Sequence, residues 1–144
     1  MIIIADTSGI IAAADRNAVE HTDCRKHLEQ AGLVVISQLV LTEVDHLAGQ
    51  RFGRTQRDSL MNFLFAQVDR MRFNIPEARL ETLTTARAVE RRYHDLELDL
   101  ADAVNVALAA EYDTDAVLTL DRRDFRAMRP LTDYGYFRLL PDDG

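Results

Sequence analysis

Short runs of branched aliphatic residues alternate along the chain with longer stretches in which apolar residues recur at every third or fourth position. Continuous apolar runs that end at turn residues are typical of strands buried on both faces, and the helical spacing is typical of amphipathic helices. The runs predict four to five strands, over 2–5, 33–36, 71–75, 116–120 and 136–140. Helices are predicted over 18–31, 38–48, 55–68, 76–93 and 100–112, with a further helix beginning near residue 8.

Capping and turn residues agree with these boundaries. Ser37 is a good N-cap for the helix that follows it, and Pro76 suits the first turn of a helix. Gly32 and Gly49 stand where the pattern ends the preceding helices. Because strands alternate with helices, the chain predicts a three-layer α/β/α sandwich with a central parallel sheet of four to five strands, in a single domain over residues 1–144.

Composition places the chain among ordinary globular proteins. Its 144 residues are 47% hydrophobic and 28% charged, which excludes a disordered tail or a fibrous repeat. No apolar run approaches the ~20 residues of a membrane span, and the first residues lack the basic stretch of a secretion signal. With Cys24 as its one cysteine the chain forms no internal disulfide, which favours the reducing cytoplasm.

Two acidic residues directly follow predicted strands. Asp6 comes after the strand at 2–5, and Asp121 comes after the strand at 116–120. The carboxyl ends of parallel strands are where open α/β sheets bind ligands. Glu43, about two turns into its helix, and Asp102, in the first turn of the last long helix, are placed to join them.

Four carboxylates at one end of a sheet suit a hard divalent cation, and two such ions about 4 Å apart form a centre that cleaves phosphodiesters. Each acid also has a structural alternative. Asp6 suits a helix cap, Glu43 a surface position, Asp102 a charge that complements a helix dipole, and Asp121 a turn. Taken one at a time, the residues leave these alternatives open.

Four short motifs occur in order: Asp6-Thr7-Ser8 after the Ile-rich strand, Leu-Thr-Glu-Val around Glu43, Ala-Asp-Ala around Asp102, and Thr-Leu-Asp-Arg-Arg-Asp-Phe at 119–125. In this combination the chain resembles the PIN-domain ribonucleases, and among them the VapC-type toxins of bacterial toxin–antitoxin pairs. The resemblance extends from residue 2 to about residue 139. It implies a metal-dependent endoribonuclease that hydrolyses RNA phosphodiester bonds.

The resemblance also implies roles for individual residues. The acidic quartet that would hold Mg²⁺ or Mn²⁺ and carry catalysis is Asp6, Glu43, Asp102 and Asp121. Polar residues expected to orient these carboxylates or metal-bound water are Thr7, Ser8, Asn105 and Thr119. Two further acids lie nearby: Asp99 is assigned to the loop before the helix of Asp102, and Asp124 is a candidate fifth carboxylate.

An acidic nuclease must still hold a polyanion, because 24 Asp and Glu against 17 Lys and Arg give a net charge of -7. Arg122, Arg123 and Arg126 follow the last acid of the quartet and are the first choice for contacts with RNA phosphates. The alternative is a solvated loop whose charge Asp124 and Asp133 balance. The resemblance further implies transfer or ribosomal RNA as substrate, a homodimer, and an antitoxin partner in a heterotetramer or larger assembly, without a membrane.

Other functions fit the residues less well. A haloacid-dehalogenase-type phosphatase needs a second acid two residues after the first, and position 8 is Ser. A receiver domain needs a lysine near its site, and Lys26, the only lysine, is poorly placed. A dinucleotide-binding domain is excluded by the absence of a GxGxxG motif. A catalytically silent PIN-like module that binds RNA or a protein remains the alternative, although acids at all four positions favour the nuclease.

Overall fold

The computed structural model describes residues 1–144 and is built around a five-stranded sheet in which every neighbouring pair is parallel. The strands are β1 (Ile2–Ala5), β2 (Leu33–Val35), β3 (Phe73–Asn74), β4 (Ala116–Leu118) and β5 (Arg138–Leu140). Their order across the sheet is β3-β2-β1-β4-β5, so β1 is central. The predicted parallel sheet is confirmed.

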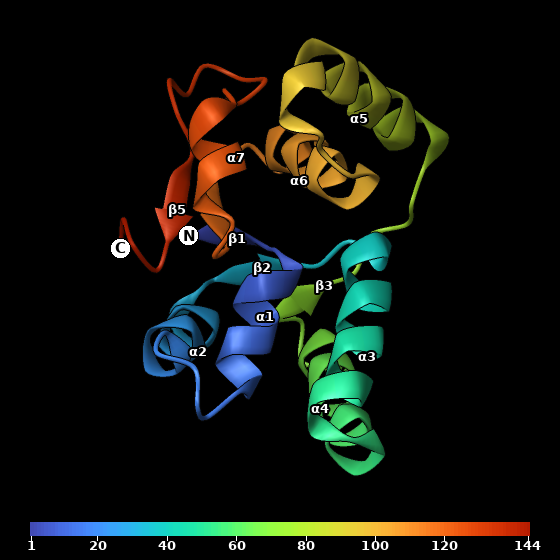
Figure 1. Ribbon diagram of the computed structural model, residues 1–144, viewed down its shortest axis with the longest axis vertical. Coiled ribbons are helices and arrows are strands. Elements are labelled where there is room, and N and C mark those ends of the chain that lie inside the picture. The colour runs from blue at the N-terminus through green and yellow to red at the C-terminus, as the bar shows by residue number, and fades with distance from the viewer.

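Seven α-helices and one short 3-10 helix accompany the sheet. They are α1 (Thr7–Ala14), α2 (His21–Gln30), α3 (Gln38–Phe52), α4 (Arg54–Asp69), α5 (Leu80–Arg92), η1 (His94–Leu96), α6 (Leu100–Glu111) and α7 (Arg122–Ala127). Helices α1 to α4 lie on one side of the sheet, and α5, α6 and α7 lie on the other (Figure 1). The predicted three-layer α/β/α sandwich is therefore confirmed. None of the helices combines the length and apolar character needed to cross a membrane.

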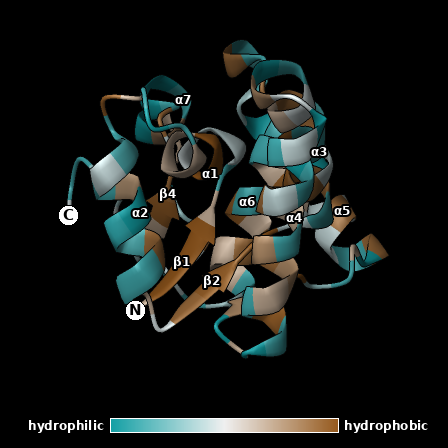
Figure 2. Cartoon of the chain, turned by 90° about the horizontal axis from the view of Figure 1, so that it is seen from below, coloured by the Kyte–Doolittle hydropathy of each residue, from teal (hydrophilic) through white to brown (hydrophobic).

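Alternate strand residues face the two helical layers. Ile3 and Val34 pack in the core cluster of α1 to α4, whereas Ile4 and Val35 pack in the cluster of α5 to α7. Both faces of the sheet are apolar, which is why its strands are continuous aliphatic runs in the sequence. Figure 2 shows the hydrophobic strands β1, β2 and β4 between helices with many hydrophilic residues.

The sheet has a topological switch point between β1 and β4. From β1 the chain adds β2 and β3 on one side, and it then returns to place β4 and β5 on the other side. The segments that leave β1 and β4 therefore diverge to opposite layers and open a crevice outside the carboxyl ends of these strands. Asp6 and Asp121 lie in these two segments.

The predicted end of the third helix is wrong. Helix α3 continues through Gly49 to Phe52 and ends at Gly53, whose φ is 85°. A Cβ at Gly49 would lie 3.3 Å from the Arg57 side chain of α4. Gly49 thus allows two helices to approach each other, and the left-handed backbone that ends the helix falls on the next glycine.

Other helices also differ from the prediction. Pro76 does not open α5, which begins at Leu80, because the intervening residues carry the chain from the edge strand β3 to the opposite layer (Figure 1). Helix α2 begins at His21 rather than at residue 18. Helix α7 is not predicted at all; it forms around Phe125, which is fully buried and packs edge-to-face on Phe137 with ring centroids 5.8 Å apart.

Candidate metal centre

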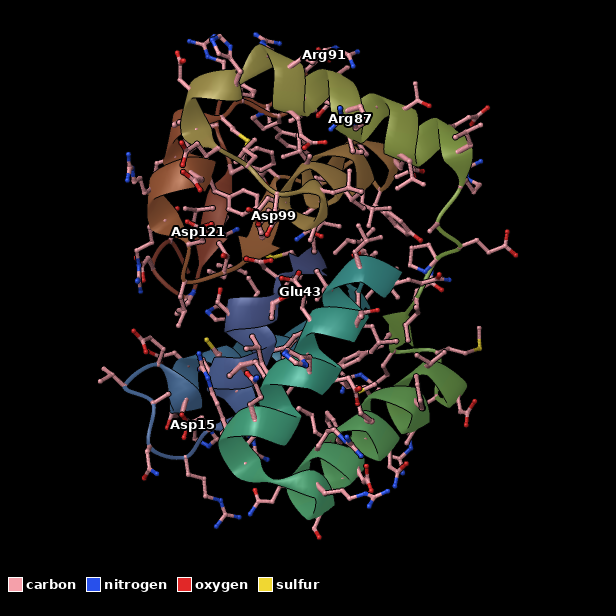
Figure 3. All side chains as sticks on the ribbon, turned by 45° about the vertical axis from the view of Figure 1, so that its right-hand side comes forward. Asp15, Glu43, Arg87, Arg91, Asp99 and Asp121 are labelled. Carbon is pink, nitrogen blue, oxygen red and sulfur yellow. The ribbon has the colours of Figure 1, made fainter.

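Four acidic residues from four parts of the chain meet at the carboxyl end of the sheet. Asp6 follows β1, Asp121 follows β4, Glu43 lies on α3, and Asp102 lies in the first turn of α6. Glu43 and Asp102 each have a pKa raised by burial and also by neighbouring carboxylates, Asp6 among them. Figure 3 shows Glu43, Asp99 and Asp121 around the region where the two helical layers meet.

Asp6 is the most buried of these carboxylates, with 5% of its surface exposed. Thr119 Oγ1 donates a hydrogen bond to its Oδ2 at 2.7 Å, and Asn105 Nδ2 donates to its Oδ1 at 3.2 Å. Although Asp6 directly precedes α1, its side chain makes no capping hydrogen bond to the helix. The helix-cap alternative is therefore wrong, and Asp6 is held by residues of α6 and of the segment after β4.

Two hydroxyls connect the ends of β1 and β4. Ser8 Oγ lies 3.3 Å from Thr119 Oγ1 and accepts a hydrogen bond from the Leu120 backbone N–H at 2.9 Å. Thr119 Oγ1 accepts another from the Asp121 backbone N–H at 2.9 Å. Thr119 donates its proton to Asp6, so Ser8 donates in the contact between the two hydroxyls. This network fixes the backbone that carries Asp121 relative to Asp6.

Glu43 enters the site from the first half of α3. Ser37 begins this helix by accepting a hydrogen bond from the Val40 backbone N–H at 3.1 Å, as predicted. Val40 and Val44 are fully buried and set the rotation of the helix. Glu43 is half-buried, and its Oε1 accepts a hydrogen bond from Thr7 Oγ1 at 3.2 Å. The surface alternative for Glu43 is therefore wrong.

Asp99 and Asp102 have different positions in α6. Asp99 is the N-cap, and its Oδ1 accepts a hydrogen bond from the Asp102 backbone N–H at 2.9 Å. Asp102 lies in the first turn, with a carboxylate oxygen within 4.8 Å of oxygens of Asp121 and Asp124. Asp99 therefore caps α6, and in addition to burial its charge also raises the pKa values of the four acids of the quartet. Asp102 is the residue whose carboxylate reaches the acids that follow β4.

Burial opposes ionisation throughout this cluster. It raises the pKa of Asp6, although the hydrogen bond from Thr119 acts in the opposite direction. Burial also raises the pKa of Asp121, and the charge of the Asp124 carboxylate raises that pKa further. For Asp102, burial and then the carboxylates of Asp6, Asp99 and Asp121 raise the pKa to about 8. The group as a whole favours binding a positive charge, as a proton or as a metal ion.

The donor atoms fit a hard divalent cation. The ligands on offer are oxygens, as Mg²⁺ and Mn²⁺ prefer, and they come from residues whose positions the fold fixes. Asn105 adds a specific observation: it is fully buried, its Nδ2 is bonded to Asp6, and its Oδ1 has no partner in the protein. An unpaired buried acceptor costs about 1–3 kcal/mol, so this oxygen is suited to a metal ion or a metal-bound water.

The chain matches a known protein family over most of its length. A family model described as the PIN domain matches residues 3–129. The chain belongs to the PIN-domain family. Over 140 residues it is 32% identical to Ribonuclease VapC26 of Mycobacterium tuberculosis, covering 96% of this chain and 100% of that protein.

Solved structures share the fold of this PIN domain. VapC20 of Mycobacterium tuberculosis, described as a toxin that cleaves the sarcin–ricin loop, superposes with a TM-score of 0.71 at 18% identity over 83% of this chain and 89% of its own. VapBC2 of Rickettsia felis, bound to a promoter DNA fragment, gives 0.69 at 14% identity over 91% and 96%. A toxin–antitoxin complex of Klebsiella pneumoniae gives 0.61 at 20% identity over 92% and 98%.

Two of the three candidate RNA-binding arginines of the PIN domain have partners within the chain. Both terminal nitrogens of Arg126 donate to Asp143, at 2.7 and 2.8 Å, and Arg122 donates to Asp142 through Nε and one terminal nitrogen. Asp124 and Asp133 are therefore not the acids that balance these arginines. Arg123 is exposed and forms no ion pair.

The acids Asp142 and Asp143 were not among the residues that the sequence singled out. They hold the end of the chain against α7, and Asp143 Oδ2 also accepts a hydrogen bond from the Leu139 backbone N–H at 2.8 Å. No spacing rule links residues 17 to 20 positions apart in an irregular segment, so the pattern of the sequence contains no signal for these pairs.

Proposed function

We propose that this PIN domain, folded as one unit over residues 1–144, is a metal-dependent endoribonuclease and the toxin of a toxin–antitoxin pair. The observation that carries the proposal is the meeting of Asp6, Glu43, Asp102 and Asp121 at the switch point of the sheet. The relative at 32% identity is named a ribonuclease, which supports RNA as the substrate. A silent binding module has no need for several buried or half-buried carboxylates without cationic partners.

The proposed chemistry divides between a bound cation and the protein. Mg²⁺ or Mn²⁺ held by the quartet supplies the Lewis-acid chemistry of phosphodiester hydrolysis. Thr119 and Asn105 orient both oxygens of Asp6, and Thr7 orients Glu43. Asp102 holds a proton near neutral pH and releases it when a cation binds, because its pKa of about 8 reflects burial among like charges.

Arg123 is the first choice for a contact with RNA. It is exposed, lies two residues after Asp121, and has a guanidinium free of ion pairs, whereas Arg122 and Arg126 bind the acids at the end of the chain. Bound cations and local arginines must offset the repulsion between phosphates and a chain of charge -7. We propose unstacked loops of transfer or ribosomal RNA as the substrate class, in line with the sarcin–ricin loop that VapC20 cleaves.

A groove between α1–α2 and α3–α4 supports an antitoxin partner. Its volume is about 960 Å³, and Phe63, which is 49% exposed, and Phe73 contribute to its apolar lining. Arg16, Arg51 and Arg70 also line it and form no ion pair within the chain. An amphipathic segment with acidic side chains fits this combination. A cognate antitoxin bound here, in a heterotetramer or larger assembly built on a homodimer, completes the proposal.

Cleavage assays on total, transfer and ribosomal RNA with Mg²⁺, Mn²⁺ or EDTA test the nuclease. We expect cleavage that requires a cation, is lost in Asp102→Asn and persists in Asp99→Asn, because asparagine still caps α6. Cleavage that continues in EDTA would refute metal dependence, and equal loss in both variants would refute the choice of Asp102 over Asp99. A folded protein that binds cations but cleaves none of these RNAs would favour the binding module.

A further inference from the structure

Four exposed arginines in the layer of α5 to α7 have no acidic partner. They are Arg91 and Arg92 in the last turn of α5, Arg123 in the first turn of α7, and Arg129 two residues after that helix. Figure 3 shows Arg91 on α5. The ion pairs of the chain all engage other basic residues. These four charges are therefore not neutralised by the protein itself.

Tyr93 holds the end of α5 beside the end of α7. It is the C-cap of α5, is half-buried, and packs against the core of this layer. Its hydroxyl accepts a hydrogen bond from the Arg129 backbone N–H at 3.0 Å, and Arg92 Cζ lies 5.5 Å from its ring centroid. Arg129 is flanked by the buried residues Met128 and Pro130. The fold therefore brings arginines from two separate segments together around one anchored ring.

Arg123 connects this group with the acidic centre. It lies two residues after Asp121 and four residues before the end of α7. Its Cα is at most about 13 Å from that of Arg129, because a helix rises about 1.5 Å per residue and extended chain at most about 3.6 Å. Arg122 and Arg126 lie one turn apart and bind acids of other segments. Unpaired positive charge therefore continues from Asp121 to the end of α5.

From this arrangement we infer that Arg91, Arg92, Arg123 and Arg129 form a docking surface for the RNA backbone, here called the α5–α7 arginine surface. It holds the part of the strand that extends from the acidic centre along α7. The inference rests on the proposed function, and it adds where the protein grips RNA away from the bond that is cleaved.

Charge and shape favour phosphates as the occupant of this surface. The chain has a net charge of -7, so RNA is repelled over most of the molecule and needs a local group of cations. A guanidinium presents a planar fork of donors that matches the oxygens of a phosphate. The large apolar groove, which suits a protein partner, lies in the opposite layer between α1–α2 and α3–α4.

An ordinary structural role for these arginines makes a different prediction. Cations in the last turn of α5 complement its dipole, and Arg92 adds a contact with the ring of Tyr93. Loss of such contacts would lower stability slightly and leave RNA binding unchanged. The affinity for RNA and its dependence on salt therefore separate a docking surface from helix-end charges.

The test is binding of a short fluorescent single-stranded RNA to the full chain with Mg²⁺, measured by anisotropy at several salt concentrations. Asp102→Asn serves as the background, so that the probe stays intact. Adding Arg92→Gln and Arg129→Gln is expected to weaken binding at least about fivefold. It should also reduce the slope of log affinity against log salt by about 1.4, which is about 0.7 for each lost phosphate contact.

Two further sets of variants control for charge and for structure. Lys26→Gln with Arg54→Gln removes two exposed cations of the other layer that form no ion pair, and should change neither quantity by more than a small amount. Arg92→Lys with Arg129→Lys keeps the charges and should retain most of the affinity. In the otherwise wild-type chain, the two Gln substitutions on the α5–α7 arginine surface should raise KM for RNA cleavage and leave kcat unchanged.

Circular dichroism establishes that each variant is folded, and Arg91→Gln alone provides a milder change in the same surface. Unchanged RNA affinity and salt slope in the two-Gln variant would overturn the inference, leave the nuclease intact, and assign the surface to an acidic protein instead. An equal loss in the Lys26 and Arg54 control would also overturn it, because net charge alone would then explain the effect. No RNA binding in Asp102→Asn, together with no cleavage by wild type, would overturn the proposed function as well.

Discussion

At Asp102, burial and three neighbouring carboxylates all favour the protonated form, and together they raise its pKa to about 8. An unfolded chain returns this side chain to a pKa of ~3.9. Between these two pKa values the folded state binds more protons than the unfolded state. The free energy of unfolding therefore falls as the pH rises. The raised pKa values of Asp6, Glu43 and Asp121 act in the same direction.

The metal-free protein is therefore expected to lose stability as the pH rises from about 4 to about 8, with little further loss from this group above that range. Urea unfolding in EDTA at a series of pH values measures the free energy of unfolding. Asp102→Asn should flatten the pH dependence, because asparagine does not titrate. A wild-type protein whose stability is flat or rises across this range would contradict the account of Asp102.

Helix α1 and strand β4 are in close contact. The segments that follow β1 and β4, which carry Asp6 and Asp121, depend on this contact. A Cβ at Gly9 would lie 2.6 Å from the Leu118 carbonyl oxygen and 2.7 Å from Leu118 Cγ. The same carbonyl accepts a hydrogen bond from the Asp6 backbone N–H at 2.9 Å. Gly9 therefore allows the first turn of α1 to rest on the end of β4, which places Ser8 beside Thr119.

Replacing Gly9 by alanine should force α1 away from β4. We expect a loss of roughly 1–3 kcal/mol in the free energy of unfolding, and weaker Mn²⁺ binding because the acids shift with the two elements. Chemical denaturation and calorimetry measure the two effects. Gly135→Ala is the control, since a Cβ there meets nothing within 4 Å. Equal effects from the two substitutions would show that the close approach does not matter.

The molecule as a whole is acidic, with a net charge of -7, and part of that charge is concentrated at one crevice. Self-repulsion in such a cluster destabilises the folded chain until a proton or a cation neutralises it. The fold therefore holds the carboxylates together at a cost in stability, and ligand binding recovers that stability. This coupling is a property of the complete structure, because the unfolded chain separates the same acids.

Mn²⁺ or Mg²⁺ should raise the thermal midpoint of the protein. Binding at a hundred times Kd adds about 2.7 kcal/mol to the free energy of unfolding when only the folded state binds. Scanning calorimetry with and without cation measures the shift. Asp6→Asn should be folded without cation and respond less to it, because the substitution relieves repulsion and removes a ligand. A wild type with no shift at millimolar cation would argue against a preformed site.

The order and type of most elements follow from the sequence alone. Aliphatic runs such as 2–5 and 33–36 are typical of strands buried on both faces of a covered parallel sheet, and Ser37 caps its helix as its side chain predicts. These signals are local, because they depend on residues within a turn or two of one another. The placement of Asp6 and Asp121 at the carboxyl ends of two strands follows for the same reason.

Tertiary structure decided the features that depend on partners distant along the chain. It assigned Asp99 to the cap of α6, ended α3 at Gly53 rather than at Gly49, and engaged Arg122 and Arg126 with acids at the end of the chain. The local sequence pattern indicates which side chains share one face of a helix or strand. It does not indicate which residues, distant in the chain, contact that face. The meeting of the acids, and the unpaired oxygen of Asn105 among them, exists only once α6 and the ends of β1 and β4 are packed together.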